Sequence, residues 1–166
     1  MLIKNNYLAL IIVSFFLFLY LGTSNAVSEV NFNFNVTEIE IDSESEKIIG
    51  KKRGILESNA GDKIEADEFV YDKINNILEL KGNVIFKDLN QTLINSGELI
   101  YNIAEDIISA RDNAIINFNK DYKILANEII YFKDKELIET KGDVKAEISN
   151  NYLIESKKII FKKKKI

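Results

Sequence analysis

The sequence predicts an all-β protein: a curled antiparallel sheet built from two-strand repeats of about 30 residues. The first observation behind this prediction is a segment that returns at a fixed interval. It reads "IEADEFVYD" from Ile64, "INSGELIYN" from Ile94, "ILANEIIYF" from Ile124 and "IESKKIIFK" from Ile154. The second observation is that apolar residues recur with a period of two, which is typical of strands, and we find no helical period beyond residue 26. Such regular spacing indicates stacked units that cannot bury their apolar faces alone.

Residues 1–26 are predicted to form a cleaved signal peptide. "MLIKNN" carries one Lys and no acid, Tyr7 to Leu21 is almost wholly apolar, and Ser24 and Ala26 suit the −3 and −1 positions of a cleavage site. The alternative is an uncleaved membrane anchor, but the apolar run is shorter than the ~20 residues that a spanning helix needs. Residues 27–166 are then expected to form one exported domain, and their lack of cysteine does not contradict export.

Composition excludes several kinds of chemistry. The chain has no Cys and no His, which removes disulfides, imidazole bases, thiol nucleophiles and nearly all zinc sites. The formal net charge of −4 argues against a nucleic-acid partner. We therefore predict no cofactor, no metal site and no binding of nucleic acid.

Each repeat holds two strands joined by a polar turn. In the first strand the apolar positions change parity between Ile64 and Phe69, which predicts a β-bulge that recurs in the later repeats. The segments "DKINN", "NIAED" and "FKDKE" suit hairpin connections. In the second strand Gly82 and Gly142 share a column with Asp112. This column predicts a kink in a curved strand, because no helix follows that would make a phosphate-binding loop.

Two sets of residues could be taken for a functional site. The carboxylates could be catalytic groups or calcium ligands, but they recur at equivalent places instead of converging. We therefore predict a solvated outer face and no enzyme; the residues are Asp67, Glu68, Glu98, Asp112, Glu128 and Asp143. The tyrosines could form a stacking ladder for sugars or bases. Their size and strand preference favour core or groove-lining positions instead, for Tyr71, Tyr101 and Tyr131.

The apolar faces of the strands must be covered, either by a second sheet or by folding the sheet on itself. Two outcomes stay open: an elongated apolar groove that would suit acyl chains, and a core filled by its own side chains. The half-repeat from Tyr152 to Phe161 leaves an edge strand. Either Lys162 to Lys165 blunt that edge against aggregation, or a partner adds a strand to it, or the sequence is a fragment.

The repeat resembles the OstA-like repeat of lipopolysaccharide transport proteins, which builds the periplasmic β-jellyroll of LptA, LptC and the N-terminal domain of LptD. The matching pattern is I-x-A-D-x-F-x-Y, a polar turn, and an apolar strand ending in K-G-N-V. Its first copy consists of Ile64, Ala66, Asp67, Phe69, Tyr71, Gly82, Asn83 and Val84. The resemblance covers about Gly61 to Phe161, and Phe34 to Asp62 is predicted to form an opening strand pair. The second repeat is weaker, with Arg111 and Asp112 in place of Lys-Gly.

The resemblance implies a V-shaped jellyroll in the periplasm, with or without association with the outer membrane. Such a domain holds lipopolysaccharide by its acyl chains, joins edge to edge with other jellyroll proteins of the transport system, and is not an enzyme. The length suits the LptA type, whereas an LptD would be cut short here before its barrel. The alternative is a secreted structural or adhesive β-repeat protein with no lipid ligand.

The resemblance also assigns residues to two surfaces. It places an inward column in the lipid groove: Ile64, Ala66, Phe69, Tyr71, Leu78, Leu80, Val84, Phe86, Ile94, Leu99, Tyr101, Ile116, Ile124, Ile129, Tyr131, Val144 and Ile154. It places the terminal strands against neighbouring proteins, with docking residues Val36, Ile39, Ile41, Leu153, Ile159 and Phe161.

Overall fold

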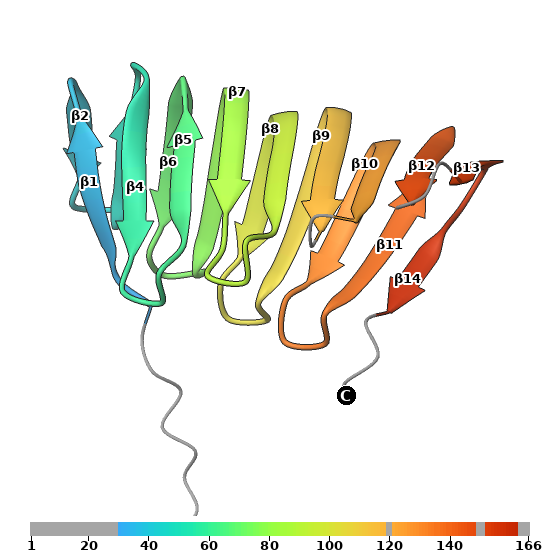
Figure 1. Ribbon diagram of the computed structural model, residues 1–166. Helices are drawn as coiled ribbons and strands as arrows, with labels where there is room; N and C mark the ends of the chain where they lie inside the picture. The colour runs from blue at the N-terminus through green and yellow to red at the C-terminus, as the bar shows by residue number, and fades with distance from the viewer. Residues whose placement is uncertain (1–29, 119–120, 149–151, 163–166) are drawn as a thin grey trace, which may run out of the picture.

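The computed structural model describes residues 30–118, 121–148 and 152–162, and there the chain consists of strands and connecting loops (Figure 1). The described residues hold fourteen strands: β1 (Phe32–Val36), β2 (Ile39–Asp42), β3 (Lys47–Gly50), β4 (Gly54–Ser58), β5 (Lys63–Ala66), β6 (Glu68–Asp72), β7 (Ile77–Lys87), β8 (Leu93–Asn102), β9 (Ile107–Phe118), β10 (Tyr122–Phe132), β11 (Leu137–Lys141), β12 (Val144–Ile148), β13 (Tyr152–Ser156) and β14 (Ile160–Lys162). The all-β prediction is confirmed. The predicted signal peptide, residues 1–26, lies outside the described residues. No helix in the described part of the chain has the length and apolar character to cross a membrane.

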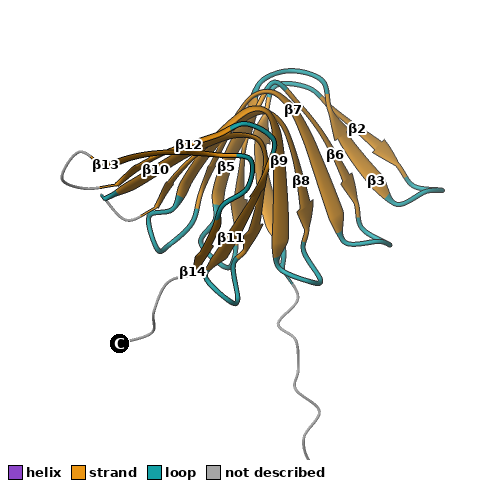
Figure 2. Cartoon of the chain, turned by 90° about the vertical axis from the view of Figure 1, so that its right-hand side faces the viewer, coloured by secondary structure: helices purple, strands orange, loops and turns teal. Residues whose placement is uncertain are grey.

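The strands form one antiparallel sheet that is folded into a V (Figure 2). The long strands β7 to β10 bend in the middle and run through both arms of the V, which we call limb A and limb B. Limb A also contains β2, β3, β6, β11 and β14, and limb B also contains β1, β4, β5, β12 and β13. The predicted curled, V-shaped jellyroll is therefore confirmed, and the inner faces of the two limbs enclose the core.

The period of about 30 residues corresponds to one strand running out and the next strand running back. Four turns of limb A, at residues 43–46, 73–76, 103–106 and 133–136, lie at this spacing. Each turn ends in a residue with positive φ: Glu46 (51°), Asn76 (53°), Asp106 (54°) and Glu136 (46°). The predicted hairpin connections are confirmed. The turn at 43–46 also shows that the repeat begins one unit earlier than the sequence pattern indicated.

The opening segment differs from its prediction, because it contains four strands, β1 to β4, instead of one pair. Both predicted strands are interrupted where later repeats bend. The apolar columns of this unit are hard to see in the sequence because Gly50 and Gly54 stand where later repeats have Leu80 and Val84. The fold requires a small residue at position 50: a Cβ on Gly50 would lie 2.1 Å from Cε1 of Phe69.

The bends of the second strands lie at the predicted kink column. Gly82, Asp112 and Gly142 have φ values of 73°, 58° and 85°, in the left-handed region that costs an L-residue energy. The pairing register shifts at the same level, between Lys81 and Val84 of β7. The first strands shift there too, between Asn95 and Glu98 of β8 and between Ala126 and Glu128 of β10. The predicted kinks and bulges are confirmed.

Substitutions in the kink column are expected to change stability in opposite directions. Gly82→Ala should lower the free energy of unfolding by about 1–2 kcal/mol, because alanine is strained at the left-handed φ of this position. The added Cβ would also lie 2.6 Å from Oδ2 of Asp67. Asp112→Gly should raise the free energy of unfolding by about 0.5–1 kcal/mol, since glycine relieves the backbone strain at a smaller cost in chain entropy. Urea denaturation of both variants checks the signs; two changes of the same sign would contradict this account of the bend.

Opposite charges alternate along the outer face of limb A. The cross-strand pairs in this row are Glu68–Lys81, Lys81–Glu98, Glu98–Arg111, Arg111–Glu128 and Glu128–Lys141. We call this row the outer ladder. Nε and Nη2 of Arg111 donate to Oε1 of Glu128 at 3.1 and 2.9 Å, and this guanidinium lowers the pKa of Glu128. Opposite charges that face each other across strands stabilise a sheet. This explains why Glu68, Glu98 and Glu128 recur in the sequence without forming a site.

The interior contains one unpartnered hydroxyl. Ser96 is 8 % exposed, and among the described residues its Oγ is a buried polar atom without a hydrogen-bond partner. The equivalent residues one repeat before and after are Ala66 and Ala126, both buried. The Ser96 hydroxyl therefore carries a desolvation cost that the other repeats avoid.

Replacing Ser96 by alanine is expected to raise the free energy of unfolding by about 1 kcal/mol, because it removes that unpaired hydroxyl. The repeat supplies the matched control: Ala126→Ser should lower the free energy of unfolding by a similar amount. Denaturant midpoints at constant slope measure both changes. A loss of stability in Ser96→Ala would indicate that the hydroxyl has a role in the folded protein.

Candidate functional site

The candidate site is the interior between limb A and limb B, where the predicted groove residues lie. Of the 17 residues predicted to line a groove, all except Ile154 have exposed fractions between 0 and 8 %. Side chains buried to this degree leave no open channel for a ligand beside them. The sequence left open whether the interior is an apolar groove or a core filled by its own side chains. In the middle of the molecule the structure has the filled core.

Ring contacts between the limbs close the two ends of this filled region. The rings of Phe32 on limb B and Tyr71 on limb A lie 5.5 Å apart. Near the other end, the ring of Phe161 on limb A lies 5.5 Å from Phe118 and 4.6 Å from Tyr122, both on limb B. The predicted tyrosine column, Tyr71, Tyr101 and Tyr131, is thus buried in the core. All three tyrosines lie on limb A and face limb B at the mouth of the V.

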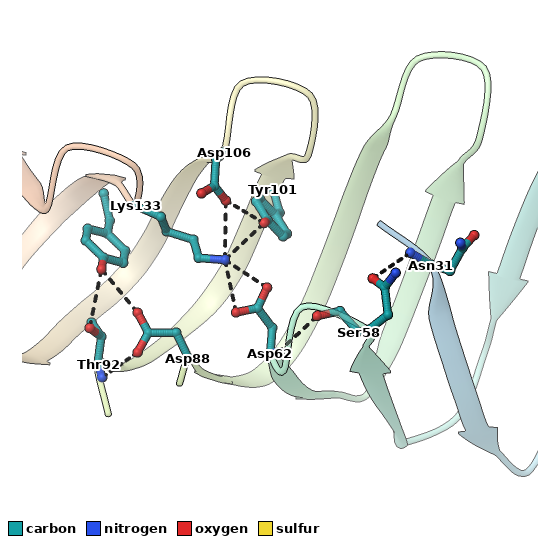
Figure 3. A network of polar contacts seen from close by, with 10 residues as sticks. Asn31, Ser58, Asp62, Asp88, Thr92, Tyr101, Asp106 and Lys133 are labelled. Carbon is teal, nitrogen blue, oxygen red and sulfur yellow. Dashed lines mark hydrogen bonds and ion pairs between the residues drawn. The ribbon is translucent and has the colours of Figure 1, made fainter. Parts of the chain in front are cut away.

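Between these rings, the middle of the mouth is closed by polar contacts (Figure 3). Lys133, in the turn after β10 of limb A, places Nζ 3.0 and 2.8 Å from the two carboxylate oxygens of Asp62, in the turn between β4 and β5 of limb B. Two residues before Lys133, near the end of β10, the hydroxyl of Tyr131 donates to Oδ2 of Asp88 on limb B at 3.1 Å. We call these two cross-limb contacts the latch.

Side chains and backbone groups around the latch fix its members in place. Nζ of Lys133 also donates to the hydroxyl of Tyr101 at 3.1 Å, and that hydroxyl donates to Oδ1 of Asp106 at 2.6 Å. The backbone N–H of Thr92 donates to Oδ1 of Asp88 at 2.8 Å. Nζ of Lys133 also lies 5.1 Å from the ring centre of Tyr101, within the range of a cation–π contact.

The buried groups of the latch have shifted pKa values. Burial raises the pKa of Asp62, and the hydrogen bond from Lys133 opposes that rise. Burial also raises the pKa of Tyr101 and of Tyr131, so both hydroxyls stay protonated and can donate. Sequence reasoning missed Lys133, Asp62 and Asp88, because each lies in a turn and no pattern links residues so far apart.

Beyond the filled region the inner faces are uncovered at both ends. Ile154 pairs with the buried Ala146 and shares its inward face, yet it is 41 % exposed because limb A does not reach over it. Ile154 therefore lies on the inward face at an open end of the interior, outside the filled region. At the other end Ile39 pairs with Gly50, which pairs with the buried Phe69, so the exposed Ile39 also faces inward.

The predicted docking residues lie on or next to edge strands. Within the described residues β1, β2, β13 and β14 each pair on one side only. Ile41 and Leu153 are exposed, while Val36, Ile159 and Phe161 pack partly against the core. The backbone of Ile159 is already bonded to Thr140: its N–H donates to Oγ1 at 2.8 Å and its carbonyl accepts from the Thr140 N–H at 3.0 Å.

Among the described residues, no group of three or more acidic, His or Cys side chains is placed to hold a metal ion. A hollow at the bend is lined by polar residues such as Asn83, Asn95 and Asp112 together with Val84 and Ile85.

Comparison with known proteins rests on structure. No family model matches the sequence, and no curated protein matches it. Among solved structures, the chain is similar to LptH, the LptA homologous periplasmic component of the conserved lipopolysaccharide transport device from Pseudomonas aeruginosa, with a TM-score of 0.62 and 9 % identity. The fold is that of the LptA-type jellyroll. The match covers 67 % of this chain and 82 % of LptH, and the predicted resemblance in fold is confirmed.

Proposed function

We propose that this LptA-type jellyroll is a non-enzymatic periplasmic component of lipopolysaccharide transport. It would hold the acyl chains of lipopolysaccharide between its limbs and pass the lipid toward the outer membrane, as an LptA-type protein or as an LptD that is cut short. The observation that carries the proposal is the fold shared with LptH over 82 % of that chain. The uncovered apolar inner faces support it, since burying each methylene of an acyl chain is worth ~0.8 kcal/mol.

The uncovered ends are the first contact surface for lipid in this proposal. Tyr152 and Ile154 on limb B are 68 % and 41 % exposed, and Ile39 on limb A is 43 % exposed. The sixteen buried residues of the predicted groove would line the lipid only after the limbs part. These residues would then lose apolar contacts with one another and gain apolar contacts with the acyl chains.

Site-specific photo-crosslinking in cells that make lipopolysaccharide tests the proposal. A photo-crosslinking residue at the inward Ile154 is expected to capture lipopolysaccharide, while the matched outward neighbour Leu153 should capture much less. Ile39 and its outward neighbour Glu40 form the same comparison at the other end. Equal labelling at inward and outward positions, or none at either, would overturn the proposal.

The second candidate is a secreted structural or adhesive β-repeat protein with no lipid ligand, and the filled middle of the interior favours it. It predicts that neither Ile154 nor Ile39 captures lipid. The same crosslinking experiment therefore decides between the two functions.

We also propose that other jellyroll proteins of the transport system add strands to the free edges. An unpaired edge offers backbone donors and acceptors to an added strand. At one end these edges are β1 and β2, and at the other they are β13 and β14. A crosslinker at the exposed Ile160 of β14 should capture such a protein, whereas one at the outer-ladder residue Lys81, in the middle of the sheet, should not.

A further inference from the structure

The mouth of the V is closed by two kinds of contact with different properties. At its ends aromatic rings meet, and ring contacts have little directionality, so an acyl chain can replace one ring with little loss. In the middle the latch joins charged and hydrogen-bonding groups, for which an acyl chain offers no substitute. The middle of the mouth therefore resists a lipid that the ends could accept.

The latch is buried enough to act as a barrier. The side chains of Asp62 and Lys133 are 2 % and 13 % exposed, with Nζ and Oδ2 2.8 Å apart. An ion pair in water contributes little to stability, but breaking a buried pair leaves each charge without its partner. Asp88 is 5 % exposed and both of its carboxylate oxygens accept hydrogen bonds, one of them from the Tyr131 hydroxyl on the opposite limb.

The latch joins two limbs whose strands run into one another at the bend and whose mouth is otherwise closed by ring contacts. Asp62 lies in the β4–β5 turn of limb B and Lys133 lies in the β10–β11 turn of limb A, so the pair joins residues 71 positions apart. Asp88 and Tyr131 are 43 positions apart. Separation of the limbs at the mouth must break both contacts, while the backbone hydrogen bonds within each limb stay intact.

We propose that the latch is a gate that keeps the limbs closed in the absence of lipid, and that an acyl chain passes the middle of the interior only when the latch opens. This inference rests on the proposed lipid-binding function. It gives Asp62, Asp88 and Lys133, which the sequence did not place in the groove, and the groove residue Tyr131 a role in controlling access to the interior.

The test replaces the ion pair without leaving a buried charge. The double variant Asp62→Asn/Lys133→Met removes both charges, and Tyr131→Phe separately removes the second cross-limb contact. The matched control is Arg111→Met/Glu128→Gln, which removes an ion pair of the outer ladder with a 2.9 Å separation. Uptake of a fluorescent lauroyl probe and of purified lipopolysaccharide is measured by stopped flow for the mature chain and each variant.

The latch variants are expected to take up both lipids at least about tenfold faster than the natural chain, which corresponds to ~1.4 kcal/mol. The outer-ladder control should match the natural chain. Equal uptake rates in the latch variants and the control would overturn the gate, even though lipid binding itself would stand.

A measurement without lipid separates the gate from the proposed function. The chain has no native Cys, so spin labels at Glu79→Cys on limb A and Lys87→Cys on limb B report the distance between the limbs. The latch variants should give a longer and broader distance distribution than the control. A broader distribution without any lipid uptake supports the gate and overturns the lipid-binding function. An unchanged distribution in folded latch variants overturns the gate.

Discussion

Replacing Phe86 by alanine is expected to lower the free energy of unfolding by about 3–5 kcal/mol. Phe86 is fully buried in limb B, and its ring lies edge-on to that of Tyr101 in limb A, with centres 6.1 Å apart. Its loss would leave a cavity between the closed limbs, which the bent strands β7 to β10 connect. Urea denaturation monitored by circular dichroism measures the change.

The neighbouring Lys87 supplies the control for this prediction. It is exposed on the outer face of the same strand, so Lys87→Ala should change the free energy of unfolding by less than about 0.5 kcal/mol. Phe86→Leu should fall between the two, because it keeps most of the apolar volume. A loss below about 1 kcal/mol in Phe86→Ala would mean that the interior is loosely packed, and the open-groove interpretation would then regain support.

The sequence predicted which residues face inward because a strand alternates its faces and the repeat fixes the phase. Ile64, Ile94 and Ile124 occupy one column, and all three are buried. The kink column was equally readable, since Gly82 and Gly142 stand at the same place in two repeats. These properties depend on neighbours within one repeat or in the adjacent repeat, which a period of about 30 residues makes visible.

Whether the interior is open or filled could not be predicted, because it depends on how closely the two limbs approach. The repeat specifies the row in which each residue lies, but it does not specify which row of limb A faces which row of limb B. Twist of the sheet brings Lys133 to Asp62, which lie in different repeats. Ile154 illustrates the same limit: its inward face followed from the pattern, but its 41 % exposure follows from where limb A ends.

Replacing Lys133 by methionine is expected to lower the free energy of unfolding by about 3–5 kcal/mol at neutral pH. The variant keeps the aliphatic length of the side chain and removes the cation that pairs with Asp62, which is 2 % exposed. The Asp62 carboxylate would then be buried without its charged partner. The double variant Asp62→Asn/Lys133→Met should recover much of the loss, because the buried carboxylate is removed together with its cation. Asp106, which also pairs with Lys133 at 3.3 Å, is 39 % exposed and stays solvated.

The stability of Lys133→Met is expected to depend on pH in a direction that identifies Asp62 as the cause. Burial already raises the pKa of Asp62 above its ordinary value of 3.8, and Lys133 opposes that rise, so its removal raises the pKa further. At pH values between the pKa of Asp62 in the unfolded chain and its higher pKa in the folded chain, the folded state binds more protons than the unfolded state. The free energy of unfolding therefore decreases as the pH rises through this window. The deficit of Lys133→Met should therefore be smaller at about pH 5 than at neutral pH, and the double variant should lack this difference. A deficit of equal size at both pH values would assign the loss to packing of the side chain and would remove the charge of Asp62 from the account of the latch.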